Sequence, residues 1–206
     1  MIRLDALAGH AAASQPFPHL AVQGLLDQAD KDALAQDFPE QKKAGFFPIE
    51  ELRYGPAFRD LLNELQQPEF SRIVGEKLGI DLTERPKMIV VRKWSAARDG
   101  RPHTDGRDKA ATALVYLNDD WDGAEGGALR FLNGPDLDGP GSDPIPARYG
   151  SLAAFARSDT SWHGHKPFVG ERRVIQIFWL VDEAAAGRKL KRHRWSRFLR
   201  VFSKRA

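Results

Sequence analysis

The pattern of hydrophobic and polar positions changes character near Arg85. Before it, apolar residues recur at helical spacing. "LLDQADKDALAQDF" predicts a helix after a short apolar run at 20–22, and "FRDLLNELQQPEFSRIVGEKL" predicts two helices separated at Gln67–Pro68, because proline is favoured only in a first helical turn. After Arg85, short β-branched or aromatic runs alternate with glycine and proline, which is typical of strands. The expected strands are "MIVVRKW", "ATALVYLN", "GALRFLN", "SLAAFA" and "RRVIQIFWLV".

These elements predict a mainly β fold with N-terminal helices, whose core is a sandwich or barrel. A chain of 206 residues with 42% hydrophobic residues can bury such a core in one domain. We expect the domain to span residues 1–187, with helical support over 24–80. The loop "NGPDLDGPGSDPIP" at 133–146 is long enough to border a binding mouth.

The composition limits which side chains can form covalent cross-links or bind a metal. The chain has no cysteine, so disulfides and thiolate ligands are excluded, and any metal must be bound by nitrogen and oxygen. The N-terminus has no long apolar segment, and no stretch reaches the roughly 18 apolar residues of a transmembrane helix. We therefore expect a soluble, cytoplasmic protein without a transmembrane segment.

The charge is unevenly distributed. Residues 188–206 contain nine Lys and Arg and no acid, whereas the rest of the chain has 22 basic and 28 acidic residues. A basic amphipathic helix over 188–206 would gather four apolar side chains on one stripe: Trp195, Phe198, Leu199 and Phe202. We expect this stripe to pack on the domain or on a second subunit. An anionic surface or polyanion is the alternative partner.

The first candidate metal ligands occur in "RPHTDGRD", in which His103 and Asp105 are two residues apart. Six histidines and 28 acidic residues would produce about one such pair by chance. His163 follows 58 residues after Asp105, and Arg172 comes nine residues later at the start of a predicted strand. Two histidines and a carboxylate form the facial triad of non-haem Fe(II) oxygenases. An arginine beside such a site can pair bidentately with a carboxylate.

Four segments occur in an order that resembles a known family: "HTD", "ATALVYLNDDWDGAEGGALRF", "GSLAAF" and "SWHGHKPFVGERRVIQIFW". Together they resemble the 2-oxoglutarate- and Fe(II)-dependent dioxygenases, specifically the prolyl 4-hydroxylase-like branch. The resemblance covers Pro86 to Leu180. It implies a distorted double-stranded β-helix, a cupin-like jelly roll over about 86–181, with the metal at its open end. "WDGAEGGALRF" resembles the family's tight hairpin, in which Gly126 and Gly127 permit unusual backbone angles.

The resemblance also implies roles for particular residues. The iron ligands would be His103, Asp105 and His163. The distal carboxylate of 2-oxoglutarate would be held by Arg172 and Tyr116. Alternation along the final strand puts Gln176 on the same face as Arg172, so Gln176 can reach the co-substrate.

One departure from the family leaves a choice between two histidines. Many members have Glu-Val after the distal histidine, whereas this chain has Gly164 and His165. His165 is only seven residues before Arg172, an awkward spacing, and in an extended segment it would point away from the face of His163. We therefore favour His163 as the ligand.

The implied activity is hydroxylation of a C–H bond with release of succinate and CO2. The cofactors would be Fe(II), 2-oxoglutarate and O2, with ascorbate as an optional addition. The substrate is unidentified, and a peptide, a sugar or a small metabolite would each be compatible. The alternatives are a cupin-like metalloprotein that does not use 2-oxoglutarate, and a non-catalytic binding module that acts through the basic tail.

Overall fold

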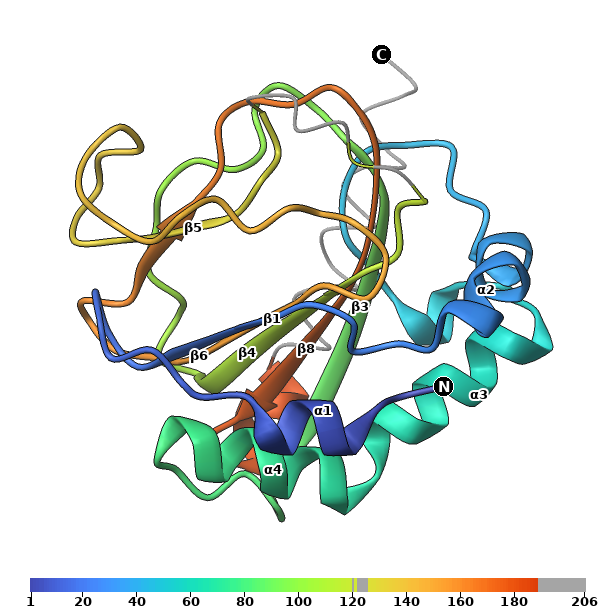
Figure 1. Ribbon diagram of the computed structural model, residues 1–206, viewed down its shortest axis with the longest axis horizontal. Coiled ribbons are helices and arrows are strands. Elements are labelled where there is room, and N and C mark those ends of the chain that lie inside the picture. The colour runs from blue at the N-terminus through green and yellow to red at the C-terminus, as the bar shows by residue number, and fades with distance from the viewer. Residues whose placement is uncertain (120, 122–125, 189–206) are drawn as a thin grey trace.

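Two antiparallel sheets form the core of the structure, a computed structural model that describes residues 1–119, 121 and 126–188 (Figure 1). The larger sheet has the strand order β1-β6-β4-β8-β3-β2, and the smaller sheet pairs β5 with β7. The strands are β1 (His19–Val22), β2 (Phe47–Pro48), β3 (Lys87–Ser95), β4 (Lys109–Tyr116), β5 (Arg130–Leu132), β6 (Leu152–Ala156), β7 (Trp162–Gly164) and β8 (Gly170–Leu180). The prediction of a mainly β fold with N-terminal helices is confirmed.

The helices precede most of the strands along the chain. They are α1 (Leu4–Gly9), α2 (Lys31–Asp37), α3 (Pro56–Gln66) and α4 (Pro68–Leu78), with 3-10 turns η1 (Gln28–Asp30) and η2 (Ile49–Glu51). The predicted break at Gln67–Pro68 is confirmed, because Gln67 has a ψ of 145° and Pro68 begins α4. The prediction that a helix begins at Leu25 is wrong, because residues 25–27 are not helical. The backbone of Leu25 bonds to Arg3 and Gly150 instead, so the helical region begins only at Gln28.

The larger sheet has two different faces. One face packs against α1, α3 and α4, which lie on the same side of the sheet (Figure 1). On this face the indole Nε1 of Trp179 donates a hydrogen bond of 3.0 Å to Ser71 Oγ in α4. The other face turns toward β5 and β7, since the Phe155 ring of β6 lies 5.5 Å from that of Phe131 in β5. We call this second face the inner face.

Two strands were not anticipated from the sequence. β2 has only two residues, and β7 consists of Trp162, His163 and Gly164, whose mixed polarity gives no alternating pattern. Both depend on a longer partner: β2 pairs with β3, and β7 pairs with β5. Tertiary pairing therefore determines these strands more than local preference does.

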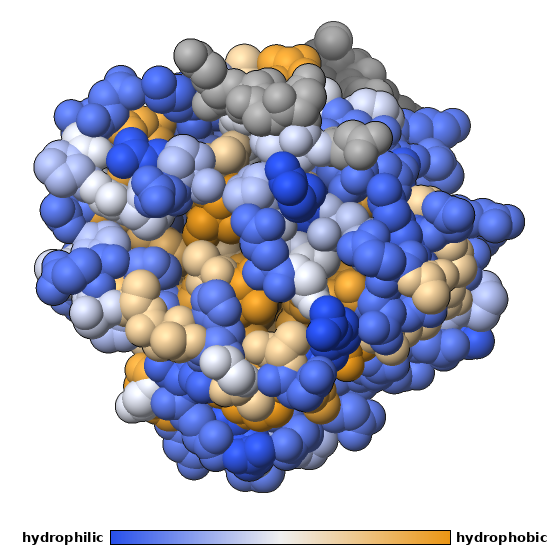
Figure 2. Space-filling model, in the orientation of Figure 1, coloured by the Kyte–Doolittle hydropathy of each residue, from blue (hydrophilic) through white to orange (hydrophobic). Residues whose placement is uncertain are grey.

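Hydrophilic residues cover most of the face shown in Figure 2, and hydrophobic side chains are visible between them near its centre. In the part of the chain that the structure describes, no helix is both long and apolar enough to cross a membrane. The predicted basic helix at 188–206 lies outside the described residues except for Arg188, and so does most of the turn of the predicted hairpin at 122–125. The domain bounds proposed from the sequence stay a prediction.

Candidate metal centre

Three side chains place potential metal-ligating atoms within 4.8 Å of one another: those of His103, Asp105 and His163. No other such group of three occurs among the residues that the structure describes. The two histidines are brought together by their backbones. His103 N donates to His163 O at 3.1 Å and His163 N donates to His103 O at 3.0 Å, so the rings lie side by side with centroids 4.4 Å apart.

Each of these histidines has one ring nitrogen occupied by a backbone carbonyl. Nδ1 of His103 lies 2.9 Å from Arg101 O, and Nδ1 of His163 lies 3.0 Å from Ser161 O. A carbonyl oxygen can only accept, so Nδ1 carries the proton and the lone pair of Nε2 is free for a metal. Burial lowers the pKa of His163 to about 4, so its imidazole is neutral near neutral pH, as metal binding requires.

Asp105 is buried and held by two side chains from β4. Thr112 Oγ1 donates to its Oδ2 at 2.5 Å, and Lys109 Nζ forms an ion pair with its Oδ1. Burial alone would raise the pKa of Asp105, but the charge of Lys109 and the two hydrogen bonds hold it below its ordinary value. A carboxylate oxygen accepts more than one bond, so these contacts orient Asp105 and leave it able to bind a metal.

A second polar group lies further along the inner face, around Arg172. This side chain is only 2% exposed. Its Nε donates to Gly127 O at 2.9 Å, and its Nη2 donates to Tyr116 Oη at 3.2 Å. Gly127 has a φ of +79°, a conformation that glycine adopts without strain. Burial raises the pKa of Tyr116 against the opposing charge of Arg172, so the phenol keeps its proton and can donate a hydrogen bond.

The register of β4 and β8 shows how far apart the two groups contact the sheet. Their inner-face residues pair in three rows: Thr112 with Phe178, Leu114 with Gln176, and Tyr116 with Val174. Asp105 contacts the first row through Thr112, and Arg172 contacts the third through Tyr116. Four residues of β4 correspond to about 13 Å along the strand. Gln176 lies in the row between the two groups.

His165, the alternative ligand, is separate from the triad. Its backbone N donates to Gly100 O at 2.8 Å, and its Nδ1 lies 2.8 Å from Lys166 O. A Cβ atom added to Gly100 would come within 2.3 Å of His165 Nδ1, so the ring packs directly on this glycine. The structure thus brings His163, and not His165, to His103 and Asp105.

Three further residues on the inner face were not predicted from the sequence as site residues: Arg92, Lys109 and Thr112. The sequence did contain a pattern that could have identified two of them. Strand alternation places Thr112 on the same face as Tyr116 in β4, and Arg92 on the same face as Val90 in β3. Lys109 is harder to identify, since it lies at the first residue of β4, where an exposed lysine is the usual reading. Its contact with Asp105 is visible only in three dimensions.

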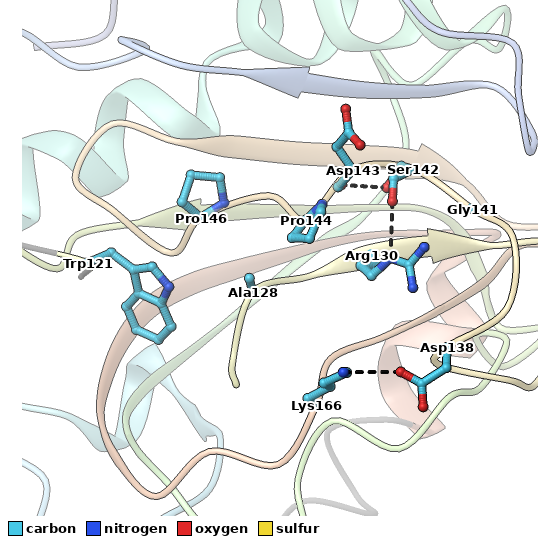
Figure 3. A pocket seen from close by; sticks show the side chains of 10 residues that line it. All are labelled: Trp121, Ala128, Arg130, Asp138, Gly141, Ser142, Asp143, Pro144, Pro146 and Lys166. Carbon is cyan, nitrogen blue, oxygen red and sulfur yellow. Dashed lines mark hydrogen bonds and ion pairs between the residues drawn. The ribbon is translucent and has the colours of Figure 1, made fainter. Parts of the chain in front are cut away.

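The loop over 133–146 lines a cavity of about 540 Å³ next to β5 (Figure 3). Ala128 and Arg130 face this cavity, whereas Phe131 alternates to the inner face, where its β7 partner is His163. The loop is anchored by Arg130, whose Nε donates to Ser142 O at 3.1 Å. The cavity therefore lies on the opposite side of β5 from the triad, and the loop borders this outer cavity.

Residues 91–181 match the model of the 2OG-Fe(II) oxygenase superfamily, a segment that holds the triad, Arg172 and Tyr116. No curated protein matches the chain. The resemblance seen in the sequence is confirmed. Oxygenases of this family use Fe(II), 2-oxoglutarate and O2, and the nitrogen and oxygen donors of a His-Asp-His triad suit Fe(II).

Solved structures share the fold. A prolyl 4-hydroxylase from Pseudomonas putida is 18% identical with a TM-score of 0.51, and the match covers 86% of this chain and 96% of that one. A Trichoplax adhaerens prolyl hydroxylase in complex with a hypoxia inducible factor peptide fragment is 15% identical, with a TM-score of 0.52 and 88% of each chain covered. HygX from Streptomyces hygroscopicus, with nickel and 2-oxoglutarate bound, is 13% identical, with a TM-score of 0.52 over 79% of this chain and 82% of that one. These likenesses confirm the jelly-roll fold.

Proposed function

We propose that this protein is a 2-oxoglutarate- and Fe(II)-dependent dioxygenase that hydroxylates a C–H bond of a substrate not yet identified, releasing succinate and CO2. One observation carries the proposal. A His-Asp-His group and an arginine–tyrosine pair both contact the inner face, at Thr112 and Tyr116, which are about 13 Å apart along β4. Either group alone could be structural, whereas the two together suit a ligand that binds a metal at one end and a guanidinium at the other.

The triad would hold Fe(II) through Nε2 of His103, Nε2 of His163 and a carboxylate oxygen of Asp105. Three protein ligands leave half of an octahedral ion open to other molecules. The bound metal, with 2-oxoglutarate, would supply the activation of O2. The contribution of Asp105 is a fixed negative charge, which Lys109 and Thr112 keep ionised and oriented before a metal arrives.

Arg172 and Tyr116 would bind the distal carboxylate of 2-oxoglutarate. Arg172 is positioned in advance, because Gly127 and Tyr116 fix its guanidinium in a buried setting where a charge-assisted pair is strong. The Tyr116 hydroxyl can donate to the same carboxylate. Gln176 lies between the metal end and the carboxylate end, so we assign it contact with the middle of the co-substrate.

The prolyl hydroxylases among the structural neighbours make a proline-containing peptide the first substrate class to test. A sugar and a small metabolite are the next classes. We also expect the domain to end near 187 and the basic segment 188–206 to pack on it or on a second subunit. Testing peptides first does not affect the assignment of the metal and co-substrate residues, which rests on the inner-face geometry.

The decisive experiment measures metal binding and succinate together. We expect calorimetry to show one Mn(II) site per chain, and succinate to form when Fe(II), 2-oxoglutarate and O2 are supplied. His103→Ala and Asp105→Ala should remove most of the Mn(II) affinity and the succinate. His10→Ala is the control, because His10 lies in the separate N-terminal segment after α1. Unchanged Mn(II) affinity in both triad variants would show that the site is elsewhere.

A further inference from the structure

A second buried arginine, Arg92, lies on the inner face of β3. Arg92 is 7% exposed, and it pairs with Val174, whose other partner is Tyr116 in β4. Arg92 therefore shares a row with Tyr116, at the end of the inner face where Arg172 lies. The guanidinium also lies over the Phe46 ring, 4.1 Å from its centroid, which limits its orientation.

A β-bulge brings the two arginines into this region. Arg92 pairs with Val174 and Trp94 pairs with Glu171, so two residues of β8, Arg172 and Arg173, stand opposite one residue of β3. Bulges redirect side chains and occur next to active sites. Burial lowers the pKa of Arg92 to about 10, with Asp99 opposing the shift and Arg172 adding to it, which is the effect of a like charge nearby.

The positive charge here is only partly balanced. Among the described residues, the one carboxylate paired with either guanidinium is that of Asp99, 3.4 Å from Arg92 Nη1. Its Oδ2 also accepts a hydrogen bond of 2.9 Å from Ala96 N. Arg92 Nε is buried and has no hydrogen-bond partner within the described part of the chain. Two buried guanidinium groups, with a single carboxylate that pairs only with Arg92, leave a charge that an anionic ligand would balance.

We propose that Arg92 is a second guanidinium for the distal carboxylate of 2-oxoglutarate, acting with Arg172; this inference rests on the function proposed above. The row of Arg92 favours the co-substrate over the substrate. Arg92 lies in the same row as Tyr116, at the end of the inner face that is farther from the triad. A reacting C–H bond of the substrate must instead lie at the end near the triad. Between Arg92 and the triad end, the inner face of β3 is apolar, with Val90 and Met88, and β8 contributes Gln176 and then Phe178.

The test compares two ligands on Mn(II)-loaded protein by calorimetry. 2-Oxoglutarate carries the distal carboxylate, and 2-oxopentanoate has the same carbon chain without it. We expect Arg92→Met to weaken 2-oxoglutarate by about tenfold or more and to change 2-oxopentanoate by less than about twofold. Lys93→Met is the matched control, because Lys93 is the next residue of β3 and its Nζ pairs at 2.6 Å with the exposed Glu40.

The other possible results distinguish failure of the Arg92 inference from failure of the proposed function. If Arg92→Met binds 2-oxoglutarate as the parent does while Arg172→Leu does not, the role of Arg92 is wrong and the proposed function stands. Equal weakening of both ligands would assign Arg92 a structural role and overturn the inference. If the unaltered protein binds Mn(II) but no 2-oxoglutarate, the proposed function itself fails. Arg92→Lys, which keeps the charge and loses the planar fork, supplies the same comparison if Arg92→Met does not fold.

Discussion

Arg172 and Arg173 are neighbours in sequence with opposite surroundings. Arg172 is buried on the inner face with Tyr116 and Gly127. Arg173 turns to the other face, where its Nε lies 2.6 Å from Glu171 Oε1 and its guanidinium lies over the Phe38 ring at 5.6 Å. The alternation of a strand was enough to predict this difference from the sequence, because successive side chains point to opposite faces whatever the neighbouring strands are.

We expect Arg172→Leu to weaken 2-oxoglutarate binding by roughly 2 to 5 kcal/mol, because it removes one partner of a buried charge-assisted pair. The affinity for Mn(II) should change little, since Arg172 lies at the other end of the site. Calorimetry on the metal-loaded protein measures both. Arg173→Leu is the control. A rise in the Michaelis constant for 2-oxoglutarate in Arg173→Leu alone would mean that the two arginines have the reverse roles.

The two histidines of "SWHGH" provide a second prediction. His163→Ala should abolish succinate production and most Mn(II) binding, because His163 lies beside His103 and Asp105. His165→Ala should keep Mn(II) affinity and measurable turnover, because His165 packs on Gly100 instead. Parallel measurements of succinate and Mn(II) affinity compare the variants. The opposite pattern would make His165 the ligand.

The burial of Arg92 is a feature that the sequence alone could not predict. "MIVVRKW" predicts a strand, and its alternation puts Met88, Val90 and Arg92 on one face. Sequence alone does not say that this face is covered by a second sheet, so the usual reading of the arginine is a surface charge. The same holds for Lys109, whose partner Asp105 is identified only by the fold.

At the scale of elements, α2 and α3 are joined by a side-chain cap. Asp37, the last residue of α2, accepts a hydrogen bond of 2.7 Å from Ala57 N in the first turn of α3. The N-cap residue Gly55 has no side chain to do this, and a Cβ at Gly55 would come within 2.1 Å of Asp37 Oδ1. The sequence predicted α3 but not its cap, because the capping group comes from 20 residues away.

Asp37→Ala should lower the free energy of unfolding by about 1 kcal/mol, the usual effect of losing an N-terminal cap. Urea denaturation followed by circular dichroism measures it. Asp60→Ala is the control, because the exposed Asp60 forms only a 3.9 Å ion pair with Arg59 and should change stability by less than about 0.5 kcal/mol. An equal loss in both variants would show that Asp37 does not act as a cap.

For the whole molecule, the order of the motifs was sufficient to predict the jelly roll, since "HTD", the β4 segment and the β8 segment each occupy a fixed place in it. The hydrophobic pattern could not give the strand order β1-β6-β4-β8-β3-β2, because several apolar strands are interchangeable until their partners are known. The pattern also could not show that Leu25 pairs with Gly150 across 125 residues instead of forming a helix.

The basic tail is the remaining prediction at this scale. The described chain approaches it through Ala185, which is fully buried in a cluster with Met88, Val90, Phe178 and Leu180. Ala185 thus packs on β3 and β8 of the larger sheet, and we expect the apolar stripe that follows in the sequence to pack on the domain nearby. We expect deletion of residues 189–206 to lower the melting temperature by roughly 4 °C or more and to increase the binding of an apolar dye.

Membrane or polyanion binding by the tail predicts a different result. The truncated protein would then melt like the full chain, and only the full chain would bind vesicles containing anionic lipid. That affinity would fall as salt is raised, because exposed charges are screened over about 8 Å at physiological ionic strength. Calorimetric melts and vesicle co-sedimentation, each on both proteins, separate the two cases. If the truncated protein keeps its melting temperature and its solubility, the prediction that the tail packs on the domain is wrong, whether or not the full chain binds the vesicles.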